Sequence, residues 1–343
     1  MLGLMLPLGP VAAQDTTEVS VLVLIADFFG WNYFDVRDTL LGWGANVTTV
    51  AYSLDYNISS CLNREPRPII ADLLLSEIDN ETLMQFDCLF IPAGGQWQSL
   101  LTSETVKRTI ETAYQLGLSV ASICIGNRVT AGANNIVNGT SVVNYLYSNT
   151  YMMNEGATVR FGPSAVSDNR IITGGGGGGL IPEGGFTLAP TEEVCAEVVR
   201  EAMGLSYVTS GQIHPSSGGP GTNFTIRVQV TDQDEVLGGH FITDISEVSA
   251  RIFVGHNRSE VASVPLTYNA AEDLFQGSWV ASSVGSYAID IEVLDSNSTL
   301  QITRNLVELS VGGLNVPLVL TAAGGISVLV AAVVIILRRR SPS

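Results

Sequence analysis

Short apolar runs alternate with helix-like stretches from residue 19 to residue 204, and this alternation sets the fold class of the first half of the chain. The runs VSVLVLIA, NVTTVAY, DCLFIPAGG and SVASICI are separated by stretches such as NYFDVRDTLLGWG and SETVKRTIETAYQLG. Strands this rich in Val, Ile and Leu are buried on both faces, and intervening helices indicate a parallel sheet with right-handed crossovers. In the second of these stretches Val106, Ile110 and Ala113 recur at the spacing of one helix face. We therefore predict an α/β domain over residues 19–204.

The chain changes character near Ser206, because the helix signals disappear after it. Segments such as TNFTIRVQVTD, SARIFVGH, SVPLTYN, LFQGSWVA, GSYAIDIEVLD and LVELSVG are separated by turn residues, and apolar residues alternate with polar ones within them. About seven short strands in about a hundred residues are typical of an immunoglobulin-like β-sandwich. We predict such a sandwich over residues 206–313, acting either as a stalk or adhesive module or as a spacer with no ligand of its own.

Both ends of the chain predict a membrane protein. Residues 316–337 carry no charge, and a helix of that length spans about 33 Å of hydrocarbon. The alternative is a helix buried in a protein core, but such a helix does not need so long a run without charge. The basic cluster Arg338–Arg340 follows directly, which predicts that the tail 338–343 is cytoplasmic. Residues 1–14 read as a signal peptide, or alternatively as a disordered apolar leader. The expected protein crosses the cell membrane once, with its large amino-terminal part outside.

Sequons and net charge support an outer location and exclude one class of partner. N-x-S/T sequons, which predict glycosylation, occur at Asn46, Asn57, Asn80, Asn138, Asn223, Asn257 and Asn297. The formal net charge is −17, and Lys107 is the single lysine. A phosphate backbone is held by clustered positive charge, so no nucleic-acid partner is expected.

Cys124 occupies the corner between an apolar run and a helix-like stretch. The run Ser119–Ile123 should be a buried strand, and a helix should begin at Gly126. This places the thiol at the carboxyl edge of the sheet, where open α/β folds have their sites. A helix amino terminus stabilises a thiolate, which predicts a lowered pKa for this thiol, whereas burial among Ile123 and Ile125 opposes it. Strand, nucleophile and helix in this order form the elbow of hydrolases.

Three segments together resemble the ThiJ/PfpI superfamily: ASICIGNRVTAGA, the preceding DCLFIPAGG, and the following MMNEGATVRFGPSAVSDNRIITGG. The resemblance covers about residues 19–204. It implies a flavodoxin-like sandwich of the class I glutamine-amidotransferase type, with Cys124 at the elbow and Gly94, Gly95 and the N–H of Ile125 in the oxyanion position. Activities in the superfamily include peptidase, chaperone, glyoxalase and deglycase, and many members form homodimers, so a homodimer is an expected partner.

Several residues depart from the pattern of that superfamily. Ile125 stands where the peptidase branch has a histidine, and Asn32 stands where the deglycase-like branch has a glutamate that hydrogen-bonds the thiol. The usual later histidine falls at Asn144 or Tyr145. Without a base the acid–base step, worth about a hundredfold to ten-thousandfold, is lost.

Asp27 and Glu155 are the nearby acids that we consider as substitutes for the missing base. The alternative is that each is solvated or caps a helix. Arg128, one turn into the following helix, could fold back toward the sulfur and favour the thiolate, although an exposed arginine is the commoner outcome.

Glycines 174–179 follow an apolar run and should lie at the same sheet edge as Cys124. Their backbone N–H groups could form a nest for a carboxylate or an oxyanion, with Gly174 and Gly175 closest to the sheet. The alternative is a flexible loop whose glycines only permit a close approach. No Lys-Ser or Lys-Thr follows the run, so it is a poor phosphate loop.

The other cysteines and the histidines give no metal or cofactor signal. His214, His240 and His256 lack the spacing of zinc ligands, and we predict neither a metal nor a cofactor. Outside the cell Cys61, Cys88 and Cys195 would include an odd thiol, but the pairing stays open, since Cys88 in a strand and Cys195 in a helix could both be core residues.

Three classes of function remain. The first is a membrane-anchored ectodomain whose degenerate cysteine pocket binds a small ligand or a partner, which the missing histidine and Asn32 favour. The second is a cysteine-dependent hydrolase, glyoxalase or deglycase acting on small carbonyl or amide compounds, which Cys124 favours. The third is a purely structural surface protein. For the first we expect a Cys124 thiol that reacts selectively over Cys88 and Cys195, with little or no turnover.

Overall fold

The structure is a computed structural model, and it describes residues 19–52, 68–176, 189–232, 237, 239, 241–255 and 257–312. The predicted signal peptide, membrane span and tail lie outside these residues, as do Asn57, Cys61, His240 and His256. Within the described part of the chain, no helix is both long enough and apolar enough to cross a membrane.

The α/β part contains a sheet in the order β3-β2-β1-β4-β5-β9-β8. Its strands are β1 (Ser20–Ile25), β2 (Asn46–Ala51), β3 (Leu73–Leu74), β4 (Cys88–Ile91), β5 (Ser119–Ile123), β8 (Ala165–Asp168) and β9 (Ile171–Gly174). Every neighbouring pair is parallel except β8 and β9, which are antiparallel. The predicted, mainly parallel α/β fold is therefore confirmed.

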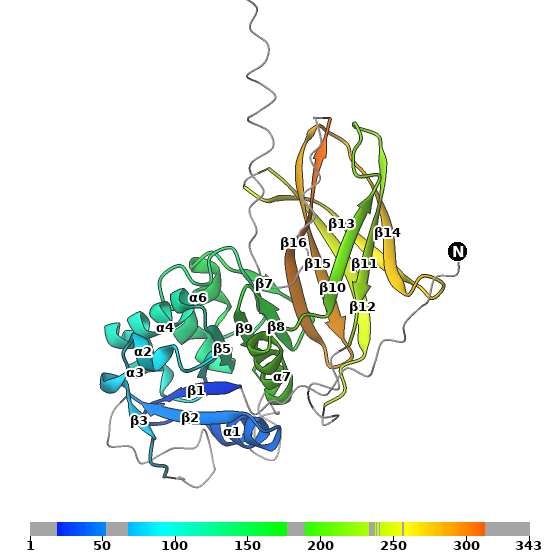
Figure 1. The fold of residues 1–343 in the computed structure, drawn as a ribbon. Helices are drawn as coiled ribbons and strands as arrows, with labels where there is room; N and C mark the ends of the chain where they lie inside the picture. The colour runs from blue at the N-terminus through cyan, green and yellow to red at the C-terminus, as the bar shows by residue number, and fades with distance from the viewer. Residues whose placement is uncertain are drawn as a thin grey trace, which may run out of the picture.

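Helices cover both faces of this sheet, as Figure 1 shows. Alternate residues of β1 enter different cores: Val21, Val23 and Ile25 pack with α1 (Asn32–Gly42) and α7 (Thr191–Ala202). Leu22 and Leu24 pack on the other side. The helices there are α2 (Asn80–Leu83), α3 (Trp97–Thr102), α4 (Glu104–Leu116), α5 (Asn127–Ala131) and α6 (Asn149–Asn154). Burial on both faces explains why the strands are continuously apolar.

Local signals fix the bounds of α4. The side chain of Ser103 accepts a hydrogen bond from the N–H of Val106 at 3.3 Å, which caps the first turn. Gly117, with φ +105°, ends the helix in the left-handed conformation that favours glycine. The predicted apolar face, Val106, Ile110 and Ala113, is buried.

The second part of the chain is all β, as predicted. Its strands are β10 (Val208–His214), β11 (Asn223–Val230), β12 (Ile245–Val254), β13 (Ser259–Asn269), β14 (Leu274–Val280), β15 (Gly285–Asp295) and β16 (Thr299–Val311). All neighbouring pairs among them are antiparallel. β13 pairs with β12 from Ser259 to Leu266 and with β14 through its last three residues. Aromatic and aliphatic side chains from these strands form one core. The immunoglobulin-like class of this part stays a prediction.

The two parts share one sheet, which the sequence did not indicate. The first residues of β16 pair in parallel with β8, from Thr299 opposite Ala165 to Ile302 opposite Asp168. Fourteen strands are thus hydrogen-bonded in succession from β10 to β3. Neither β10 nor the first half of β16 was among the predicted strands. A separate small sheet pairs β6 (Ser141–Val143) with β7 (Thr158–Arg160).

Candidate functional site

Cys124 stands in the strained backbone conformation of a nucleophile elbow. It directly follows β5, has φ +59°, and begins a 3-10 turn that runs into α5. Left-handed backbone is costly for a residue with a side chain, so such strain persists where the surrounding structure enforces it. Gly126 contributes, because a Cβ there would lie 2.6 Å from the carbonyl oxygen of Ile91. The predicted helix is present, but it is short and begins at Asn127 instead of Gly126.

Two hydrogen bonds reach the sulfur of Cys124. Its Sγ lies 3.1 Å from the hydroxyl oxygen of Tyr145. The backbone N–H of Ile125 donates to the same sulfur. Of the two positions, Asn144 and Tyr145, where the resemblance expects a histidine, it is Tyr145 whose side chain contacts the thiol. Sequence reasoning identified this position but did not assign Tyr145 a role.

Tyr145 is held in place from several sides. Its backbone N–H donates to Oδ1 of Asn149 at 2.8 Å, and the side chain of Asn149 donates in turn to Asn144. The ring lies directly against Gly176, where a Cβ would be 2.0 Å from a ring carbon. On the same loop, Ser148 donates from its hydroxyl to the carbonyl oxygen of Cys124 at 3.2 Å. The loop before α6 is therefore fastened to the elbow at both the side chain and the backbone of Cys124.

The expectation of a lowered thiol pKa is wrong. Burial raises the pKa of the Cys124 thiol, and its hydrogen bonds with the Tyr145 hydroxyl and the N–H of Ile125 lower that pKa by less. Burial also raises the pKa of Tyr145, as does its contact with the sulfur. The resting state at neutral pH is a neutral thiol beside a neutral phenol. The short helix α5 does not offset the loss of solvation.

Arg128 neither folds back onto the sulfur nor extends freely into solvent. Its guanidinium lies 4.4 Å from the ring centre of Trp97 and 4.6 Å from that of Tyr151, so it is stacked between two aromatic rings. Its Nε donates to the carbonyl oxygen of Tyr147 at 2.6 Å. This positive charge lowers the pKa of Tyr145, although burial outweighs it.

The two acids considered as substitute bases differ in position. Glu155 is exposed at the carboxyl end of α6, whereas Ser148, which contacts Cys124, precedes the first turn of that helix. About 10 Å of helix separates the two ends, so Glu155 is not placed to act on the thiol. Asp27 follows β1 at the carboxyl edge of the sheet and is partly buried.

Asn32 and the glycine pair lie together beside the elbow. Oδ1 of Asn32 accepts a hydrogen bond from the N–H of Ala93 at 3.1 Å, directly before Gly94. Its Nδ2 is buried and has no hydrogen-bond partner in the described structure. Gly94 has φ +124°, and a Cβ there would lie 2.2 Å from the backbone nitrogen of Gly30. Gly95 is exposed. The turn that carries the predicted oxyanion donors thus requires glycine at position 94.

The described glycines of the run after β9 are engaged in the sheet and do not form an open nest. Gly174 pairs with Ile123, and its carbonyl oxygen accepts from the side chain of Asn127 at 3.0 Å. The N–H of Gly175 donates to the carbonyl oxygen of Ser164 at 2.8 Å. Their predicted position at the edge beside Cys124 is confirmed. The N–H of Gly175, however, is already used, which argues against its predicted role as an anion donor.

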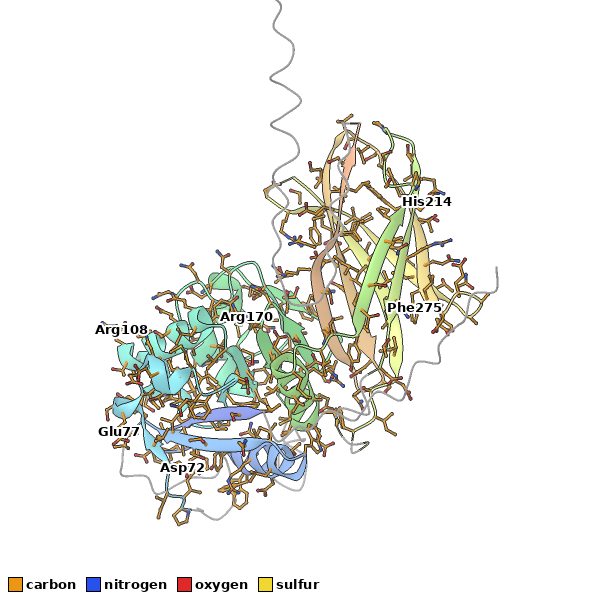
Figure 2. The ribbon with its side chains drawn as sticks, in the orientation of Figure 1. Asp72, Glu77, Arg108, Arg170, His214 and Phe275 are labelled. Carbon is orange, nitrogen blue, oxygen red and sulfur yellow. The ribbon has the colours of Figure 1, made fainter. Side chains whose placement is uncertain are left out.

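The remaining predicted residues lie away from the elbow or outside the described chain. Cys88 and Cys195 are fully buried free thiols in β4 and α7, as core residues would be. His214 ends β10 in the β-rich part, outside the α/β part that carries Cys124 (Figure 2). Across the described ranges, no group of three or more His, Cys, Asp or Glu side chains could hold a metal ion.

The described sequons lie mostly at the surface. Exposed asparagines occur at Asn46, Asn80, Asn138, Asn223 and Asn257. Asn297 is half-buried, and its Nδ2 donates to the carbonyl oxygen of Ile242, so a glycan there would replace that bond. Use of these sequons stays a prediction.

Comparison with known proteins gives a family and a fold. Residues 19–182 match the DJ-1/PfpI family. No curated protein matches the chain. Among solved structures, the ThiJ/PfpI domain protein from Brachyspira murdochii is similar at 17% identity with a TM-score of 0.44, over 56% of this chain and 100% of that one.

Two further structures show a similar degree of likeness. DJ-1beta from Drosophila melanogaster is 21% identical, with a TM-score of 0.44, over 54% of this chain and 90% of that one. A ThiJ/PfpI family protein from Pseudomonas syringae is 17% identical, with a TM-score of 0.45, over 58% and 76%. Residues 19–182, which form most of the α/β part of the chain, are a DJ-1/PfpI family domain with a flavodoxin-like fold.

Proposed function

We propose that the DJ-1/PfpI domain binds small carbonyl compounds at Cys124 by reversible addition to the sulfur, with little or no turnover. The observation that carries the proposal is the 3.1 Å contact between the sulfur of Cys124 and the hydroxyl of Tyr145. A phenol supplies or accepts a proton during addition, but at neutral pH it is a poor general base for activating water. The site therefore suits capture of an electrophile better than its hydrolysis.

The addition step balances within the site. The sulfur forms a bond to the carbonyl carbon, the π electrons of the carbonyl move to its oxygen, and the thiol proton ends on that oxygen through the hydroxyl of Tyr145. The product is a hemithioacetal, and nothing is oxidised or reduced. The N–H of Ile125 and the unpartnered Nδ2 of Asn32 are hydrogen-bond donors near the elbow that support binding of the new oxygen.

A second candidate is a cysteine-dependent hydrolase, glyoxalase or deglycase, as is frequent among relatives of this domain. The same contact favours it, because Tyr145 could relay the proton between thiol and substrate. The hydroxyl would then replace the histidine that the resemblance expects, at a cost in rate, because the pKa of Tyr145 is raised.

Turnover and binding separate the two candidates. Hydrolysis of peptides and glutamine and consumption of methylglyoxal should be measured for the parent protein, Cys124→Ala and Tyr145→Phe. The proposal expects no Cys124-dependent turnover. It also expects that millimolar methylglyoxal, bound at Cys124, protects this thiol from an alkylating reagent. Turnover that disappears in Cys124→Ala would establish the enzyme instead. A thiol as inert as Cys88 would leave the elbow as fold architecture only.

We also propose that the domain is displayed outside the cell on a single membrane span at residues 316–337. The uncharged span, the basic cluster after it, the apolar leader and the sequons support this placement. In it the β-rich part is an immunoglobulin-like stalk, and a homodimer on the surface is expected. Protease added to intact cells should remove nearly all of the mass; protection of residues 19–310 would reverse the orientation.

A further inference from the structure

Arg128, four residues after Cys124, is held in an orientation that leaves part of its guanidinium unused. Trp97 and Tyr151 cover the two faces of the group at 4.4 and 4.6 Å. Nε is occupied by the carbonyl oxygen of Tyr147. Within the described residues, nothing accepts a hydrogen bond from Nη1 or Nη2. The free part is therefore the outer edge of the fork, which matches the two oxygens of a carboxylate.

The three residues around Arg128 come from the elements that surround the elbow. Trp97 begins α3, three residues after Gly94. Tyr147 and Tyr151 belong to the segment whose Tyr145 and Ser148 contact Cys124. The rings of Tyr145 and Tyr147 meet edge to face at 5.6 Å. The charge of Arg128 is close enough to the Tyr145 hydroxyl to lower its pKa, and that hydroxyl contacts the sulfur of Cys124. Arg128 therefore belongs to the group of side chains around the elbow.

The surroundings favour a singly charged anion over a phosphate. Arg128 is the cationic side chain that hydrogen-bonds this loop, and the protein as a whole is strongly acidic, with a net charge of −17. A phosphate dianion is normally held by several donors or cations, whereas one guanidinium is sufficient for a carboxylate. The Arg128 side chain would lose little conformational freedom on binding a ligand, because the two rings and the Tyr147 carbonyl already order it.

We propose that Arg128 binds the carboxylate of the compound that adds to Cys124, so that the site is selective for aldehydes or ketones carrying a carboxylate. This inference rests on the proposed function, because it requires addition of a carbonyl carbon to the sulfur. Arg128 is a specificity residue here: it contacts the ligand but takes no part in bond formation.

The test uses 4-oxobutanoate and its neutral methyl ester, which carry the same aldehyde. Two methylene groups allow the carboxylate to turn toward Arg128. The readout is protection of Cys124 from iodoacetamide, followed by mass spectrometry of the peptide containing it. We expect the acid to protect at about tenfold lower concentration than the ester, in line with a hydrogen bond to a charged group. Arg128→Gln should abolish this difference between acid and ester within the same variant, and Arg128→Lys should retain only part of it.

Arg108→Gln is the matched control, because Arg108 is an exposed arginine on α4 and its loss changes the net charge equally. Equal protection by acid and ester in the parent would overturn the carboxylate assignment and leave the proposed function standing. Stronger protection by glycolaldehyde phosphate than by 4-oxobutanoate would assign Arg128 to phosphate and overturn it too. Protection by none of the three would refute both proposals. A urea unfolding midpoint of Arg128→Gln close to that of the parent shows that the variant is still folded.

Discussion

The reactivity of Cys124 depends on a balance between burial and two hydrogen bonds. Burial raises the thiol pKa, while the Tyr145 hydroxyl and the Ile125 N–H stabilise the thiolate and lower it by less. The folded thiol therefore holds its proton to higher pH than an unfolded one. Cys88 shows how far burial alone can raise a thiol pKa in this protein. Its side chain is fully buried, and although the neighbouring Ser119 lowers the pKa, burial raises it to about 12.

Alkylation of Cys124 should accordingly increase with pH through pH 9 without reaching a plateau near neutrality. Tyr145→Phe removes a hydrogen bond that lowers the pKa, so alkylation at pH 8 should be about two- to tenfold slower. Rates by mass spectrometry between pH 6 and 10 measure both effects. Cys88 is the internal control and should stay unlabelled in the folded protein. A plateau below pH 8 would show that the thiolate is favoured after all.

Gly94 offers a residue-level test of the turn beside the elbow. Gly94→Ala would place a Cβ against Gly30 and Phe28 at a φ of +124°, so we expect a loss of at least about 2 kcal/mol in the free energy of unfolding. Gly42→Ala, at the end of α1 with nothing within 4 Å of its Cβ, is the control and should be neutral or stabilising by up to about 1 kcal/mol. Urea unfolding measures both variants. Equal effects would mean that the turn is not constrained.

At the scale of elements, strand types were predictable from the sequence but strand partners across the two parts were not. Continuous apolar runs identified β1, β2, β4 and β5, because a strand buried on both faces has no polar side. The pairing of β16 with β8 joins segments more than a hundred residues apart, and no local pattern encodes it. Glu292 reads as a solvent-facing residue of β15, yet it is buried because Arg160 of β7 and Arg251 of β12 bind its carboxylate.

The candidate site was predictable to the same extent. The elbow at Cys124 follows from a local strand–corner–helix pattern. The contacts of Tyr145 and Arg128 depend instead on how the loop before α6 folds over the elbow, and Trp97 comes from a different segment altogether. The thiol pKa depends on the total burial of the sulfur, which a sequence does not show.

The junction of β8 and β16 depends on one buried ion pair. Asp168 is 1% exposed, and both of its oxygens accept from Arg304 of β16 at 2.6 Å. Arg304→Ala would leave a buried carboxylate with only the Ser141 N–H, so we expect a loss of about 3 kcal/mol in unfolding free energy. Asp168→Asn in the same chain should recover part of it. Arg37→Ala is the control: it removes an exposed ion pair, and its effect on the unfolding free energy should be small. An effect of Arg304→Ala as small as that of Arg37→Ala would contradict the interpretation.

At the scale of the whole molecule, the shared sheet predicts one cooperative unit. Besides the β8–β16 pairing, Glu197 of α7 accepts a hydrogen bond from Gln301 of β16, and Arg160 of β7 forms an ion pair with Glu292 of β15. Hydrogen exchange in increasing urea should therefore show β5 and β15 losing protection together, in a single transition. Loss of protection in one part at a lower urea concentration would show that the two parts unfold independently. Figure 1 shows them lying side by side along this junction.

The order of β8 and β16 in the chain also has a consequence during synthesis. At about 5 to 20 residues per second, roughly 7 to 27 s pass between translation of Ala165 and of Thr299. Throughout that interval the edge of β8 is open and Asp168 has no arginine. A ribosome-bound chain that ends before residue 299 should therefore aggregate more readily than the completed protein. It should also stay bound to a chaperone for longer.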